Sequence, residues 1–65
     1  MTLKSVQKRV AEIEAKAHPL TAWAHIAEDH LYLDILRFAA AGHDVTELAK
    51  VALQTKDIEF PRWYE

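Results

Sequence analysis

Residues 20–42 have the sequence LTAWAHIAEDHLYLDILRFAAAG. The stretch contains no proline, and its single glycine, Gly42, stands at the end, where a left-handed residue commonly follows a helix. Pro19 stands just before it, and Thr21 has the hydroxyl of a good N-cap residue. The stretch therefore predicts one long helix over about 21–41.

This predicted helix is apolar on two sides. At about 100° per residue, its apolar residues fall on two nearly opposite faces. The first face holds Leu20, Ala24, Ala27, Leu31, Ile35 and Phe38, and the second holds Ala22, Ile26, Leu33, Leu36 and Ala40. Two apolar faces need two partners, so one is expected to pack against the chain's own helices and the other against a second copy. We therefore expect a homodimeric helical bundle with Ile26, Leu33, Leu36 and Ala40 in its oligomer face.

A shorter helix is predicted on each side of the long one. Before it, apolar residues recur at alternating spacings of three and four, which predicts a helix over about 2–17 that Pro19 ends. Those residues are Leu3, Val6, Val10, Ile13 and Ala17. After it, Asp44 is the expected N-cap of a third helix over about 44–55, with Glu47 placed to complete a capping box.

The last ten residues, 56–65, lose the helical pattern and are predicted to form an irregular aromatic tail. Pro61 biases Phe60 toward an extended backbone. One interpretation is that Ile58, Phe60 and Trp63 cover the open side of a core too small to seal itself. The other is that the tail docks a partner, since aromatic residues and arginine dominate interface hot spots. The candidate contacts for that are Phe60, Arg62, Trp63 and Tyr64.

Composition limits the class of protein. With 65 residues and no cysteine, the chain predicts one all-α domain over 1–65, with a marginal core and neither disulfides nor thiolate metal sites. Its net charge of −2 lacks the positive field typical of nucleic-acid binding. The sequence has neither the pattern of a signal peptide nor an apolar run long enough for a membrane span, so a cytoplasmic protein without membrane contact is expected.

Two polar groups on the long helix are candidates for chemistry. His25 and Asp29 lie one turn apart and are the candidate metal ligands, with Glu28 nearby on what is expected to be a solvated strip. His30 lies about 140° from His25 around the helix, so one ion in one chain cannot use both. We therefore expect neither a metal nor another cofactor.

The second polar group is His30, Asp34 and Arg37, spaced four and three apart so that Asp34 can bond to either neighbour. A catalytic histidine would need a nucleophile, and the threonines at helix ends are explained by capping. An ion-pair network and a protein without enzymatic activity are therefore expected.

Residues 39–49 resemble the turn of a helix-turn-helix motif, with small residues and Gly42 before a capped helix. The following helix offers few base-reading side chains, only Lys50, Gln54 and Lys56. A helical hairpin turn explains the same residues. The favoured function is therefore a small non-enzymatic adaptor or accessory module that binds an unidentified protein as a homo-oligomer. The alternative, a nucleic-acid-binding regulator, needs Lys4, Lys8 and Arg9, or Lys50 and Lys56, on one face.

Overall fold

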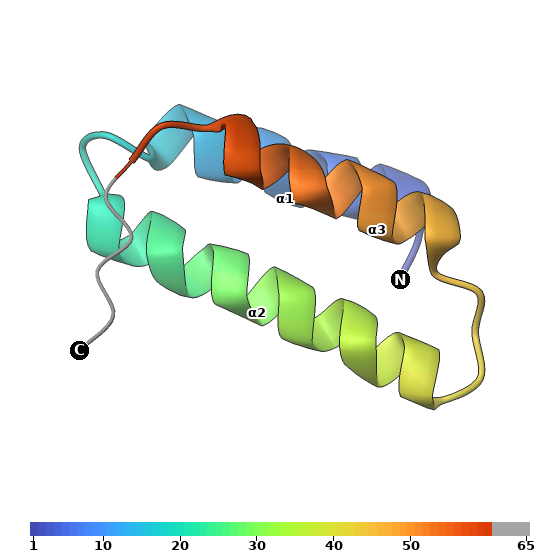
Figure 1. The fold of residues 1–65 in the computed structure, drawn as a ribbon. Helices are drawn as coiled ribbons and strands as arrows, with labels where there is room; N and C mark the ends of the chain where they lie inside the picture. The colour runs from blue at the N-terminus through green and yellow to red at the C-terminus, as the bar shows by residue number, and fades with distance from the viewer. Residues whose placement is uncertain (61–65) are drawn as a thin grey trace.

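The computed structural model describes residues 1–60, which form three α-helices and one short 3-10 helix (Figure 1). These are α1 (Leu3–Lys16), α2 (Thr21–Ala40), α3 (Thr46–Ala52) and η1 (Leu53–Asp57). No strand occurs within residues 1–60. The prediction of a small all-helical domain with three helices is confirmed. The tail residues Arg62, Trp63 and Tyr64, for which contacts were predicted, lie outside the described residues.

The three helices pack as two layers. Helices α1 and α3 lie side by side and run in the same direction, while α2 runs in the opposite direction and packs against both (Figure 1). Consecutive helices are therefore antiparallel neighbours joined by short turns, as in a helical bundle. This arrangement leaves the side of α2 that faces away from α1 and α3 without cover from residues 1–60.

Helix α1 begins where the sequence predicts, and its first turn is closed by a capping box. The Thr2 hydroxyl accepts a hydrogen bond from the Ser5 backbone N–H at 3.1 Å, and the Ser5 hydroxyl accepts one from the Thr2 N–H at 3.0 Å. Two backbone donors at the helix start are thereby satisfied.

Helix α2 starts differently from the prediction. Leu20 is its N-cap residue and makes no side-chain capping bond, so Thr21 is not the cap. The Thr21 hydroxyl instead donates to the carbonyl of Ala17 at 2.9 Å, because the carbonyls at the end of α1 lie one turn earlier without helical partners. The other end agrees with the prediction, since Gly42 has a φ of +98°.

Helix α3 is shorter than predicted. It begins at Thr46, and the Asp44 carboxylate accepts from both the backbone N–H and the hydroxyl of Thr46, at 2.9 and 2.8 Å. The N-cap residue is Val45 and not Asp44 as predicted, and it has no side-chain capping bond, so Glu47 does not complete the predicted capping box. The Glu47 carboxylate instead lies 3.7 Å from Nζ of Lys50. After Ala52 the chain tightens into η1, so helical structure continues to Asp57 and the non-helical segment begins at Ile58 instead of residue 56.

The core lies between the two layers and uses the inner face of α2. Of that predicted face, Ala24, Leu31 and Ile35 are buried, while Leu20 is half exposed. Ile58 and Phe60 are also buried and pack into the core, as the covering interpretation of this segment expects. The remaining buried apolar residues are Val6 and Ile13 of α1, Ala17 directly after α1, and Leu48 and Ala52 of α3. In the part of the chain described, none of the helices has both the length and the apolar character to span a bilayer.

Candidate functional site

An exposed apolar feature of the surface is the outer face of α2, defined as Ala22, Ile26, Leu33, Leu36 and Ala40. Ile26 is 55% exposed, Leu33 43% and Leu36 66%, and both alanines are exposed. From Ile26 to Ala40, these side chains project within about 80° of one another around the helix axis. The structure therefore places the four residues of the predicted oligomer face together on one open side of the molecule.

Two opposite charges flank Leu33 on this outer face. Asp29 precedes Leu33 by four residues and Arg37 follows it by four. The Asp29 carboxylate lies 3.4 Å from Nε2 of His25, and the Arg37 guanidinium lies 3.7 Å from the Asp34 carboxylate. Both side chains stay largely in solvent, at 54% exposed for Asp29 and 70% for Arg37, so each remains accessible to a group outside the chain.

An apolar pocket of about 150 Å³ continues the outer face toward α3. Leu36 belongs to both features, and Leu53 at the start of η1 is another large exposed side chain of the pocket wall. The remaining wall residues are Tyr32, Ile35, Ala49 and Ala52. The exposed apolar surface thus extends across the boundary between α2 and α3.

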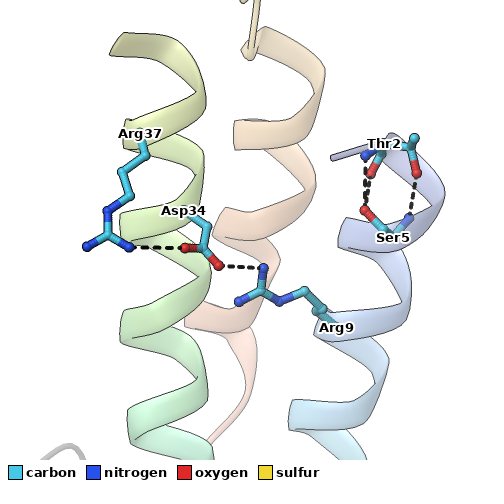
Figure 2. A network of polar contacts seen from close by, with 5 residues as sticks. All are labelled: Thr2, Ser5, Arg9, Asp34 and Arg37. Atoms are coloured by element: carbon cyan, nitrogen blue, oxygen red, sulfur yellow. Dashed lines mark hydrogen bonds and ion pairs between the residues drawn. The ribbon is translucent and has the colours of Figure 1, made fainter. Parts of the chain in front are cut away.

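Asp34 is the centre of a polar network that joins α1 to α2 (Figure 2). Nη1 of Arg9 donates to Oδ2 of Asp34 at 3.0 Å, while Arg37 approaches the other carboxylate oxygen. The sequence predicted the bond to Arg37 by helical spacing, but it gave no local signal for Arg9, which lies 25 positions away. Within residues 1–60, Asp34 pairs with Arg9 and Arg37 and forms no ion pair with His30, so a histidine oriented by this carboxylate is not formed there.

The prediction that Glu28 lies on a solvated strip is wrong, because its side chain is fully buried. Its Oε1 lies 3.7 Å from Nζ of Lys56, and that ammonium also lies 5.4 Å from the centre of the Tyr32 ring. The Tyr32 hydroxyl is hydrogen-bonded to the hydroxyl of Thr55, which is buried as well. These polar contacts hold η1 against α2, and a buried carboxylate needs such partners to offset the loss of its hydration.

A second, larger cavity of about 470 Å³ lies between α1 and the α3–η1 segment. We call it the α1/α3 groove. Val10, Val51 and Ile58 give it an apolar surface. Glu14, in the last turn of α1, and Asp57, the last residue of η1, add two carboxylates to its lining. Gln7, Ala11 and Gln54 complete the lining. Because none of the lining residues within 1–60 is a cation, this part of the groove combines apolar contact area with negative charge.

The structure brings the candidate metal ligands His25 and Asp29 together as a pair, 3.4 Å apart. A single imidazole and a single carboxylate supply fewer ligands than a stable zinc site requires. Within residues 1–60, no group of three or more histidine, aspartate or glutamate side chains is arranged to hold a metal ion. The pair is explained as a contact between neighbouring turns of α2.

The chain matches no protein-family model, no curated protein and no solved structure.

Proposed function

We propose that this chain is a small non-enzymatic interaction module that acts as a homodimer, with two copies joined through the outer face of α2. The observation that carries the proposal is the exposure of Ile26, Leu33 and Leu36 on one side of a helix whose other side forms the core. Burying a large aliphatic side chain fully is worth about 1.5–3 kcal/mol, so three of them, twice over, offset a large share of the cost of association.

A second copy is the simplest cover for this face. Helices α1 and α3 both pack against the inner side of α2, so neither is free to reach the outer side. A closed two-fold interface buries the same patch on both copies and leaves no open end for further addition. It also supplies the additional burial that a domain of this size needs.

The α1/α3 groove supports the partner-binding part of the proposal. Because α1 and α3 lie on the inner side of α2, dimerisation through the outer face leaves both copies of the groove open. Val10 and Val51 offer contact to an apolar side chain, and Glu14 and Asp57 offer charge to a neighbouring lysine or arginine. The dimer would therefore bind two basic, partly apolar peptide segments, a bivalent arrangement that raises avidity without new contacts.

The nucleic-acid alternative is disfavoured by ion pairs within the chain. Five basic residues were expected to supply a phosphate-binding face, and three of them lie beside carboxylates of the same chain. These are Arg9 with Asp34, Lys50 with Glu47 and Lys56 with Glu28. Their charge is largely compensated, which weakens the electrostatic term that dominates phosphate binding.

The homodimer is tested by Leu33→Asp with Leu3→Asp as a matched control. Leu3 is 42% exposed and Leu33 43%, but Leu3 lies on α1. Size-exclusion chromatography with light scattering should show that Leu33→Asp halves the mass or abolishes helical circular dichroism, because the interface would bury facing carboxylates. Leu3→Asp should keep the wild-type mass. A Leu33→Asp protein that stays dimeric would exclude this face as the interface.

A further inference from the structure

Resting on the proposed homodimer, we infer that the two α2 helices pair antiparallel with their two-fold axis at Leu33, so that Asp29 of each copy faces Arg37 of the other. The inference concerns the register and direction of the interface, which the existence of a dimer leaves open. In this arrangement the outer face of α2 is complementary to itself in both shape and charge.

The spacing of the charges carries the first step. Asp29 lies four residues before Leu33 and Arg37 four residues after it, which is about 6 Å along the axis in each direction. In an antiparallel pair centred on Leu33, a residue that precedes the centre by a given distance lies opposite the residue that follows it by the same distance. Asp29 of one copy and Arg37 of the partner subunit therefore lie at the same position along the helix axis. Because the dimer is symmetric, this pairing occurs twice.

The apolar residues show the same complementarity. Ile26 precedes Leu33 by seven residues and Ala40 follows it by seven, so the same symmetry places a large side chain opposite a small one at both ends. Large facing small allows two helices to approach closely without voids or overlap. Leu33 meets its own copy at the centre, where an exposed leucine supplies the apolar contact.

Two other arrangements of the same face are less favourable. A parallel pair would set Asp29 beside Asp29 and Arg37 beside Arg37, so like charges would meet at two levels. An antiparallel pair shifted to bring Leu33 opposite Asp29 would press a carboxylate against a leucine and remove its water without a compensating partner. The register centred on Leu33 sets opposite charges together at both levels.

The contacts within one chain leave Arg37 and Asp29 able to pair with the other copy. Arg37 lies 3.7 Å from Asp34 with its side chain 70% exposed, whereas Arg9 holds the same carboxylate at 3.0 Å. Arg37 can therefore turn toward Asp29 of the partner subunit while Asp34 keeps a cation. Asp29 lies 3.4 Å from Nε2 of His25 and is 54% exposed, so its carboxylate is similarly placed to meet a cation of the partner subunit.

Disulfide formation tests the register, because the chain has no cysteine of its own. Under mild oxidation, Leu33→Cys should give a covalent dimer, and a mixture of Ile26→Cys and Ala40→Cys chains should give the mixed dimer, identified by mass. Ile26→Cys alone should stay monomeric on a denaturing gel, since the antiparallel pair separates the two copies of residue 26 by about 21 Å. Lys4→Cys on α1 is the control for random collision. Rapid crosslinking of Ile26→Cys with itself would establish a parallel pair and overturn the inference.

A charge exchange gives an independent readout. Asp29→Arg and Arg37→Asp should each raise the dimer dissociation constant by about tenfold, because each places like charges opposite one another twice. The double variant should return to near the wild-type constant. Loss without recovery in the double variant, with the wild type still dimeric, would reject the register but leave the homodimer intact. A monomeric wild type would instead reject the proposed function itself.

Discussion

Arg9 and Asp34 form a hydrogen-bonded ion pair of 3.0 Å that joins α1 to α2 across 25 positions of sequence (Figure 2). Both side chains keep roughly a third or more of their surface in water, at 33% and 41% exposed. Solvent screening therefore limits what the pair contributes to the free energy of unfolding, even though its geometry is good.

The first prediction concerns this pair. A double-mutant cycle with Arg9→Ala and Asp34→Ala should give a coupling energy of about 0.5 kcal/mol in urea unfolding at fixed protein concentration. The coupling should shrink in 1 M salt, because both side chains are partly exposed to solvent. The Lys16 and Glu12 pair on the surface of α1 serves as the reference cycle. Strictly additive effects of the two substitutions would show that the pair adds nothing to stability.

The second prediction concerns the buried carboxylate. Glu28→Ala should lower the free energy of unfolding by about 3 kcal/mol, because it leaves Lys56 without its buried partner and opens a cavity in the core. Glu12→Ala, which removes an exposed glutamate paired with Lys16, is the matched control and should cost less than about 0.5 kcal/mol. Equal costs for the two variants would contradict the placement of Glu28 in the core.

The third prediction concerns the segment after η1. Phe60→Ala should destabilise the protein by about 3 kcal/mol, because Phe60 is buried among core residues. Leu53→Ala is the control, since Leu53 is 59% exposed and its truncation should cost well under 1 kcal/mol. Truncation after Thr55 removes Lys56, Ile58 and Phe60 together and should leave the chain unfolded by circular dichroism. A stable, helical truncation product would show that this segment is dispensable for the core.

The fourth prediction concerns pH. Hydrogen bonds from the backbone N–H and then the hydroxyl of Thr46 hold the pKa of Asp44 below its ordinary value of 3.8. A group whose pKa is depressed on folding stabilises the folded state above its unfolded pKa, and that contribution is lost as the pH falls through the folded pKa. Carbon NMR titration of the Asp44 carboxyl should show the lowered pKa directly.

Thr46→Val separates the two causes of the Asp44 shift. It removes the hydroxyl but keeps the backbone N–H, which is the larger cause, so most of the lowering of the pKa should persist. Asp44→Asn should remove this acid-dependent loss of stability altogether. An Asp44 pKa at its ordinary value in the wild type would mean that the turn before α3 is not closed by this carboxylate.

The sequence predicted the helices well because their signals are local. Pro19 and Gly42 bracket α2, and the spacing of three and four in α1 fixes which side of it is apolar. The helix ends were predicted less well. At Thr21, the hydroxyl bonds to a carbonyl of the preceding helix instead of capping its own, and this competition depends on how the turn folds.

Glu28 shows where residue type misled the prediction. It lies four residues after Ala24 and three before Leu31, so its spacing alone places it on the inner face. Its charge led instead to the prediction of a solvent-exposed side chain, because glutamate is almost never fully buried unless it is paired. Its partner, Lys56, lies 28 positions away, so no local sequence pattern predicts the contact. Arg9 and Asp34 were missed for the same reason, since their pairing depends on how α1 packs against α2.

The outer face of α2 was predicted from periodicity, and in the structure its large apolar side chains are exposed. Sedimentation equilibrium of the unmodified chain at low micromolar concentration tests the proposed cover most directly. The account predicts a mass of twice the 7.5 kDa of one chain, with a helical spectrum. A helical species of 7.5 kDa that persists at higher concentration would contradict it, because Ile26, Leu33 and Leu36 would then be stably exposed to water in a folded monomer.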